Sequence, residues 1–254
     1  MHSQETVSHA LELHRAGLGA RRIAKRLDIP LATVRDWCGG RVPRHSLPDD
    51  STGLIRPLCD RCGSSVHDFV NLSPAYVYLL GLYLGDGCIS SCHRGVFRFR
   101  IALDTRYPGI IRSAAAAITE IRGGVSHVQR QPGNWVEVSG YSKSWPCLFP
   151  QHAPGKKHDR PITLTAWQQE LVGRWPDQLI RGLIQSDGCR FVNTGRGNWT
   201  WPRYSFTQKS DDIRGIFCDA CDHMGLHWTQ AGTRIYISRK ADVARLDQFI
   251  GPKR

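Results

Sequence analysis

Two aspartates, Asp86 and Asp187, lie near the ends of two short segments that are nearly alike. Residues 79–87 read LLGLYLGDG and residues 180–188 read IRGLIQSDG, so each mostly apolar run closes on an aspartate followed by glycine. The aspartates are 187 − 86 = 101 residues apart, about the length of one small α/β unit. Carboxylates are hard oxygen ligands that hold Mg²⁺ together with phosphate and water. An internal repeat with one carboxylate per copy therefore predicts a paired site for Mg²⁺ and phosphate.

The helices that must position these aspartates each have one face without bulk. Gly81 and Gly85 lie four residues apart in the first segment, as do Gly182 and Ser186 in the second. Helices with small residues at this spacing can cross with their backbones nearly in contact. If the two helices pack about a pseudo-twofold axis, both aspartates meet at that axis, at helix C-termini whose dipoles favour a cation.

The glycines after the aspartates, Gly87 and Gly188, are expected to adopt the left-handed conformation that often ends a helix. A single Asp-Gly pair would be explained by helix termination alone. Two pairs at a domain-sized interval, in a strongly basic chain, favour a shared site instead.

Each motif begins a repeat of helices and strands. Ser73-Pro74 marks the start of the first motif helix, with a capping hydroxyl and a proline in the first turn. Alternation, periodicity and turn signals then predict the same order of elements in both copies. In the first copy we expect a strand near 96–100, a helix over 109–121 and a hairpin at 132–134; in the second, strands near 190–195 and 200–207, a helix over 211–224, a hairpin at 231–232 and a helix over 241–250.

The composition indicates a polyanionic partner. The chain has 254 residues, a net charge of +12 and a sequence pI of about 9.6. On the predicted strands, four arginines alternate with apolar or aromatic neighbours and are expected to contact DNA: Arg98, Arg100, Arg203 and Arg234. The apolar runs are too short to cross a bilayer, and the first residues do not read as a signal peptide. We expect a soluble, intracellular (cytoplasmic) protein without a membrane partner.

The N-terminal region, residues 1–45, is predicted to be a small all-α DNA-binding domain. Three helices fit the sequence, over 7–16, 20–27 and 31–38. A tight turn between the last two describes a helix-turn-helix, with Thr33 and Arg35 facing outward toward DNA. A helical hairpin that serves as a scaffold is the alternative, which the basic second helix disfavours.

Residues 46–72 are interpreted as a linker that contains a zinc knuckle. Cys59 and Cys62 have the Cys-x-x-Cys spacing, followed by glycine, that can aim two thiolates at one Zn²⁺, and His67 is the best third ligand. The fourth ligand stays open among several residues: Cys38, His45, Cys88 and Cys92. A second pair with this spacing, Cys218 and Cys221, falls in a predicted helix and is interpreted as packing.

The two motifs resemble those of the LAGLIDADG (DOD-type) homing endonucleases, in the single-chain form with two motifs, over residues 73–254. The match is glycine at the third position, aspartate at the eighth and glycine at the ninth in both copies. Gln185 and Ser186 depart from the usual residues of the second copy. The resemblance implies an α+β fold of two pseudo-symmetric αββαββα half-domains, at 73–150 and 177–254 with a connector over 151–176, forming a saddle over the DNA major groove.

The resemblance also implies roles for individual residues. Asp86 and Asp187 would bind Mg²⁺ or Mn²⁺ with the backbone carbonyls of Gly85 and Ser186. A Lys or Gln near the scissile phosphates organises water in this family, and Gln208-Lys209 matches that position in the second repeat. We assign Lys209 the catalytic role, while the first repeat has Asp104-Thr105-Arg106 at this place and no equivalent lysine.

These residues predict a site-specific, Mg²⁺-dependent double-strand DNA endonuclease of the homing type that acts as a monomeric pseudo-dimer. The alternative is a transcription regulator, because a helix-turn-helix beside LAGLIDADG-like repeats also resembles the WhiA-type regulators. Such regulators keep the fold and lose the metal site. Both aspartates are retained here, which favours the nuclease.

Overall fold

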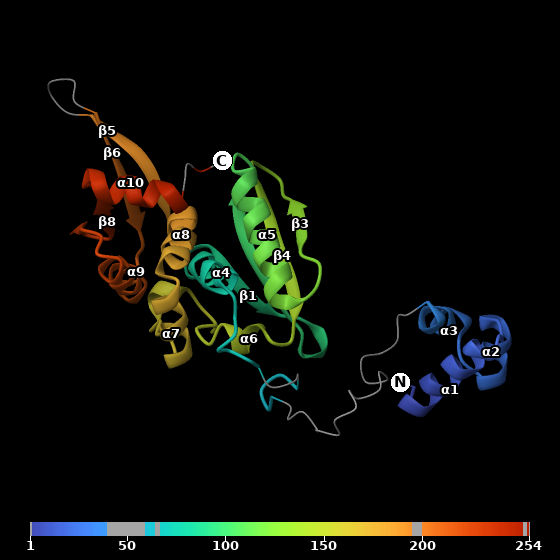
Figure 1. The fold of residues 1–254 in the computed structure, drawn as a ribbon. Helices are drawn as coiled ribbons and strands as arrows, with labels where there is room; N and C mark the ends of the chain where they lie inside the picture. The colour runs from blue at the N-terminus through green and yellow to red at the C-terminus, as the bar shows by residue number, and fades with distance from the viewer. Residues whose placement is uncertain (1, 40–58, 64–66, 195–199, 251–252, 254) are drawn as a thin grey trace. The chain divides into compact units, whose positions relative to one another are not determined.

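A computed structural model describes residues 2–39, 59–63, 67–194, 200–250 and 253. The chain divides into two compact units, Met1–Arg56 and Pro57–Arg254 (Figure 1). The boundary places the Cys59–Gly63 turn with the larger unit, whereas the sequence had assigned it to a linker between domains. None of the helices in the described ranges is both long and apolar enough to span a membrane.

The smaller unit consists of the three predicted helices, α1 (Gln4–Arg15), α2 (Ala20–Leu27) and α3 (Leu31–Cys38). Buried side chains of all three helices and the α2–α3 turn form its core: Val7, Ala10, Ile23, Ala24, Ile29, Val34 and Trp37. The turn between α2 and α3 is tight because Asp28 adopts a left-handed conformation with φ 52°. Helix α1 starts three residues earlier than expected, since the Ser3 hydroxyl caps it by accepting from the Thr6 amide at 3.2 Å.

The larger unit contains the αββαββα order twice, so the predicted fold class is confirmed. The first half consists of α4 (Pro74–Gly85), β1 (Gly87–Ser91), β2 (Phe97–Asp104), α5 (Pro108–Arg122), β3 (His127–Arg130), β4 (Trp135–Ser142) and the one-turn helix α6 (Trp145–Leu148). The second half consists of α8 (Pro176–Asp187), β5 (Gly188–Thr194), β6 (Thr200–Thr207), α9 (Asp211–His223), β7 (Trp228–Ala231), β8 (Arg234–Ile237) and α10 (Lys240–Phe249). The connector between them carries α7 (Ala166–Arg174).

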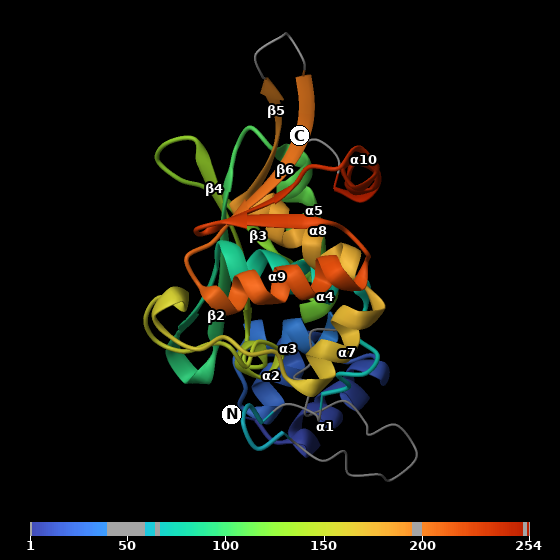
Figure 2. The ribbon, with the colours of Figure 1, turned by 90° about the vertical axis from the view of Figure 1, so that its left-hand side faces the viewer.

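The two halves have the same sheet topology. Their antiparallel sheets follow the orders β1-β2-β4-β3 and β5-β6-β8-β7. The register also corresponds, because Gly87 pairs with Ile101 and Gly188 pairs with Phe206. Helix α5 packs against α4, and α9 packs against α8, so each half covers one side of the central helix pair (Figure 1, Figure 2). Ile101 is therefore structurally equivalent to Phe206, and three residues earlier on each strand Arg98 corresponds to Arg203.

Helices α4 and α8 cross with their backbones in contact, as the small-residue spacing predicted. A Cβ atom on Gly81 would lie 2.9 Å from the Gly182 Cα, and one on Gly182 would lie 2.4 Å from the Tyr78 carbonyl oxygen. Nine consecutive residues of α4, Tyr76–Leu84, are buried, because α4 packs against α8, α5 and β1. The crossing thus fixes where both helices end.

Gly87 and Gly188 are not left-handed helix caps, contrary to the sequence prediction. Gly188 is extended, with φ −110° and ψ 171°, and each glycine is the first residue of a strand. A Cβ on Gly87 would lie 2.4 Å from the Tyr83 Cα, and one on Gly188 would lie 2.7 Å from the Ile184 Cα. Glycine is required here because the new strand leaves along the helix it follows, with no room for a side chain.

The crossing predicts that Gly182→Ala destabilises the larger unit by about 1–3 kcal/mol, because the methyl group meets backbone atoms that cannot move aside. The matched control is Gly215→Ala inside α9, where a Cβ meets nothing within 4 Å and alanine should stabilise the helix by up to about 1 kcal/mol. Urea unfolding of both variants measures the difference. Equal stability of the Gly182→Ala variant and the unchanged protein would contradict the close crossing.

Candidate active site

The two motif aspartates are brought together at the ends of the crossed helices. Asp86 is the C-cap of α4, and Asp187 is the last residue of α8. A Cβ on Gly85 would lie 3.1 Å from the Asp187 Oδ2, so the second carboxylate lies against the last turn of the first helix. The convergence that the repeat predicted is therefore present.

The pKa values of both carboxyl groups are raised. Removal from water and the nearby Asp86 charge raise the pKa of Asp187 to about 6. Asp86 is more open to solvent, and partial desolvation by the surrounding protein still raises its pKa above the ordinary value. The ammonium groups of Lys157 and Lys253 oppose both shifts. Because both carboxyl groups are harder to ionise here than in water, a positive charge beside them is favourable.

Lys157 occupies this electronegative place in the first half. Its ammonium donates to the backbone carbonyl oxygens of Gly85 at 2.7 Å, Gly87 at 2.8 Å and Tyr83. Burial lowers the pKa of Lys157 to about 8, although both motif aspartates act to raise it. The Gly85 carbonyl, expected to bind metal, thus accepts from an ammonium here and retains a second lone pair.

Lys253 takes the corresponding place in the second half. Its ammonium donates to the Ser186 carbonyl oxygen at 3.4 Å, and Ser186 precedes Asp187 as Gly85 precedes Asp86. Burial lowers the pKa of Lys253, opposed first by Asp86. Sequence reasoning missed both lysines. They follow their aspartates by 157 − 86 = 71 and 253 − 187 = 66 residues, a parallel that the alignment of the two copies could have revealed.

Gln208, and not Lys209, reaches the motif carboxylate in the second half. The Gln208 amide donates to the Asp187 Oδ2 at 2.7 Å, while the Lys209 side chain is exposed. By register, the first-half equivalent of Gln208 is Leu103, which is buried and apolar. Asp104, beside it, is held by two hydrogen bonds from the Arg106 guanidinium. The two copies therefore differ at this position: the second has a polar glutamine beside its aspartate, and the first has an apolar leucine.

One of the two motif carboxylates, Asp187, borders two cavities large enough for a phosphate group. A cavity of about 380 Å³ is lined by Tyr83, Lys157, Asp187 and Gln208 among others. A second, of about 440 Å³, contains Asp187 together with Ser186 and Arg234. A larger cavity, of about 580 Å³, lies between α7 and α9 and includes neither motif aspartate. The site that carries the charged groups is thus open to a ligand on both sides of Asp187.

Arginines line the sheet faces that point away from the helices. In β2, Phe99, Ile101 and Leu103 face the core, so Arg98 and Arg100 face outward as predicted. Both guanidinium groups pair with the buried Glu137 of β4, Arg100 at 3.7 Å. Arg98 also lies over the Tyr141 ring, 5.7 Å from its centroid. Glu137 therefore holds the two arginines in place without using all their donors.

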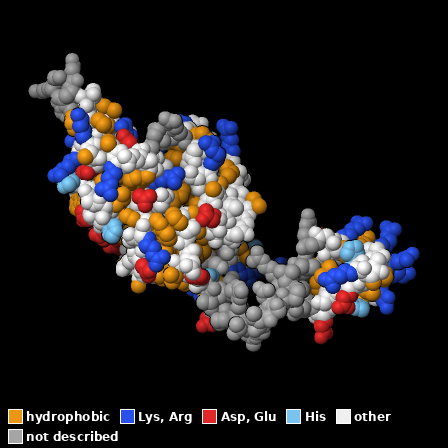
Figure 3. All heavy atoms as spheres, in the orientation of Figure 1, with side chains coloured by type: hydrophobic (Ala, Val, Ile, Leu, Met, Phe, Trp, Pro, Cys, Tyr) orange, Lys and Arg blue, Asp and Glu red, His pale blue; other side chains and the backbone are white. Residues whose placement is uncertain are grey.

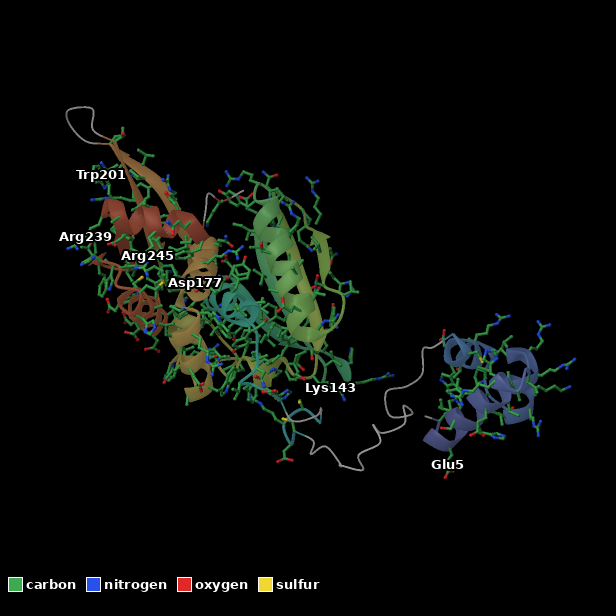
Figure 4. All side chains as sticks on the ribbon, in the orientation of Figure 1. Glu5, Lys143, Asp177, Trp201, Arg239 and Arg245 are labelled. Carbon is green, nitrogen blue, oxygen red and sulfur yellow. The ribbon has the colours of Figure 1, made fainter. Side chains whose placement is uncertain are left out.

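The second sheet presents Arg203 and Arg234 in the same way. Arg203 alternates with the buried Tyr204, and its Nε has no hydrogen-bond partner among the described residues. Arg234 is exposed and donates to Thr207 at 3.2 Å. Strand β6 pairs with β8 only from Tyr204 onward, so β5 and the first part of β6 project as a two-stranded arm that carries Trp201 (Figure 4).

The smaller unit exposes more positive charge on α2 than on α3. Arg35 is exposed and Thr33 is half-buried on α3, whereas α2 exposes Arg21, Arg22, Lys25 and Arg26. Figure 3 shows many Lys and Arg side chains on the surface of this unit. The charge expected for DNA binding is present, with most of it on the helix before the predicted recognition helix.

The predicted zinc ligands Cys59, Cys62 and His67 are brought together, and a residue that was not considered, Cys147 of α6, joins them. Of the proposed fourth ligands, Cys88 and Cys92 belong to the same unit and lie outside the cluster, so these two expectations were wrong. Cys38 belongs to the smaller unit, and its candidacy stays a prediction. His45 lies outside the described residues. Cys218 and Cys221 are buried in α9, which confirms that they pack in the core.

The solved structures that this chain resembles are LAGLIDADG homing endonucleases. The LAGLIDADG meganuclease I-AabMI bound to uncleaved DNA is 13% identical, with 70% of this chain and 83% of that chain covered and a TM-score of 0.44. The LAGLIDADG homing endonuclease I-SmaMI bound to cleaved DNA is 11% identical, with 72% and 84% covered and a TM-score of 0.44. No protein-family model matches the sequence, and no curated protein matches it. A likeness at this level carries no functional assignment, which has to come from the geometry of the two halves.

Proposed function

We propose that this chain is a site-specific, divalent-metal-dependent double-strand DNA endonuclease of the LAGLIDADG homing type. One observation carries the proposal. Each crossed helix ends in an aspartate, and a lysine ammonium donates to the backbone carbonyl of the residue that precedes this aspartate. Two such sets on a pseudo-twofold axis match the two scissile phosphates of a DNA duplex. A purely structural role for the crossing would not require a half-buried lysine at the end of each helix.

The donor set fits Mg²⁺ or Mn²⁺. Asp86 and Asp187 supply hard carboxylate oxygens, and the carbonyl groups of Gly85 and Ser186 supply neutral ones at helix C-termini. When bound there, the metal would provide charge neutralisation and a nucleophilic water at neutral pH. The two carboxylates would hold such an ion.

The remaining polar groups would act on phosphate and water. The Lys157 and Lys253 ammonium groups would stabilise charge on the phosphate oxygens of the two strands, from positions already fixed by backbone carbonyls. Gln208, held by Asp187, would orient water in the second half. This assigns to Gln208 the role that the sequence suggested for Lys209, and it makes the two half-sites unequal.

DNA would be held by the sheet faces that carry Arg98, Arg100, Arg203 and Arg234. Alternation with core residues directs these side chains away from the protein interior, where base edges of the major groove can be reached. The helices of the smaller unit, with Thr33 and Arg35, would provide a second contact on a long target. A pseudo-symmetric monomer already contains both half-sites.

We predict that Asp86→Asn and Asp187→Asn each lower the rate of DNA cleavage by about 100-fold or more, because each removes a charged metal ligand. The substrate is a duplex selected from a random library by binding in Ca²⁺, and cleavage is started with Mg²⁺. The control is Asp177→Asn in the first turn of α8, which should cut normally. Binding in Ca²⁺ should persist in all three variants, since every arginine and lysine that would contact DNA is unchanged.

Undiminished cleavage by the double variant Asp86→Asn/Asp187→Asn would overturn the assignment. Specific, salt-sensitive binding by the unchanged protein with neither strand cut in Mg²⁺ or Mn²⁺ would favour the regulator instead.

Lys157→Met is predicted to lower cleavage by about 100-fold while DNA binding changes only slightly, because one ammonium near the scissile phosphate is lost. The control is Lys156→Met, which removes the same charge from the adjacent, exposed position. Single-turnover rates and Kd values measured for both variants separate chemistry from binding. Equal rate losses in the two variants would mean that Lys157 contributes only general positive charge.

A further inference from the structure

Three cysteines and one histidine converge where the segment before α4 meets the first half. The ligand atoms of Cys59, Cys62, His67 and Cys147 all lie within 4.8 Å of one another. The Cys59 and Cys147 sulfurs are 3.8 Å apart, and the Cys62 sulfur is 3.3 Å from the His67 Nε2. The residues come from two places in the sequence separated by about eighty positions.

The spacing of these atoms is that of a tetrahedral metal site. With Zn–S bonds of about 2.3 Å, two thiolates on one Zn²⁺ lie about 3.8 Å apart, and a thiolate and an imidazole nitrogen lie about 3.6 Å apart. The observed 3.8 Å and 3.3 Å are close to these values, and a disulfide between Cys59 and Cys147 would need about 2 Å. Three thiolates and one imidazole are a donor set that selects zinc over Mg²⁺.

The backbone of the Cys-x-x-Cys turn already has a form that aims both sulfurs inward. The Gly63 amide donates to the Cys59 carbonyl at 2.7 Å, and the Cys62 amide donates to the same oxygen at 3.3 Å. Gly63 has φ +65°, a left-handed conformation that a side chain would disfavour. The turn therefore presents Cys59 and Cys62 on one side without a further change of the backbone.

The fourth residue is held by the core of the first half. Cys147 is buried in α6, between Trp145, whose Nε1 donates to the Gly140 carbonyl at 2.9 Å, and Phe149, which packs against Tyr83 of the motif helix. The position of its sulfur is thus fixed by the body of the protein. An ion bound there would join the turn to a rigid support.

The segment itself has little apolar surface with which to hold its place. Asp60, Arg61, Asp68 and Val70 are exposed, and Phe69, stacked on Trp167 at 4.3 Å, is the main aromatic contact. A stretch of this composition does not order itself by burial alone, whereas a metal that requires a preformed site can order it.

We propose that Cys59, Cys62, His67 and Cys147 bind one structural Zn²⁺ that fastens the segment before the first motif helix to α6. The site is separate from the motif aspartates in both place and chemistry. It belongs wholly to the larger unit and fixes the point at which the chain enters that unit. The ion would thus stabilise the larger unit itself.

The test is the zinc content of the full chain purified without chelator, measured by mass spectrometry for the unchanged protein and matched variants. We expect about one zinc per chain, lost in Cys147→Ser and in His67→Ala. His67→Cys, which offers a fourth thiolate, should retain the metal, as should Cys92→Ser outside the cluster. Cobalt substitution should give the visible absorption of a tetrahedral thiolate site only in variants that retain zinc.

A second readout covers the case in which Cys147→Ser fails to fold. A strong zinc chelator should lower the Tm of the unchanged protein and of His67→Cys, and should leave His67→Ala unaffected. Unchanged protein without zinc would overturn the proposal, and so would equal zinc content in His67→Ala and the unchanged protein. Neither result depends on whether the chain cuts DNA.

Discussion

The contact between the backbones of α4 and α8 is the constraint on which the rest of the structure depends. Because Gly81 and Gly182 leave no side chains between the helices, the two C-termini reach the same place. Asp86 and Asp187 follow there, and each strand that begins at the next glycine leaves along its own helix into a sheet. The position of the charged site and of both sheets thus follows from one crossing.

The two halves share a topology and differ around the carboxylates. Lys157 is held by three carbonyl groups and Lys253 by one. Gln208 contacts Asp187 in the second half, where the first half has the apolar Leu103. A duplicated unit keeps the geometry that the crossing requires, while groups beyond the crossing are free to diverge. Such divergence suits an asymmetric DNA target, which presents different surroundings to each half.

The sequence predicted most of the fold because its signals are local. Glycine spacing, strand alternation and turn residues gave the order of elements in both halves and the pairing of the two aspartates. Residues delivered by long connections were missed, since Lys157, Lys253 and Cys147 reach their sites only through tertiary structure. The sequence predicted that Gly87 and Gly188 are glycines because of a left-handed backbone conformation, and this reason was wrong. Glycine is needed at both positions because a side chain would collide with the preceding helix.

The central claim is that the two motif aspartates hold the metal that cuts DNA, and Mn²⁺ anomalous scattering tests it most directly. Crystals of the protein with a selected DNA site would be soaked with Mn²⁺ and compared with crystals of Asp86→Asn/Asp187→Asn. The account predicts anomalous density between the Asp86 and Asp187 carboxylates, beside the scissile phosphates, that is absent in the double variant. Density of equal strength in the double variant, or Mn²⁺ bound only elsewhere, would contradict it.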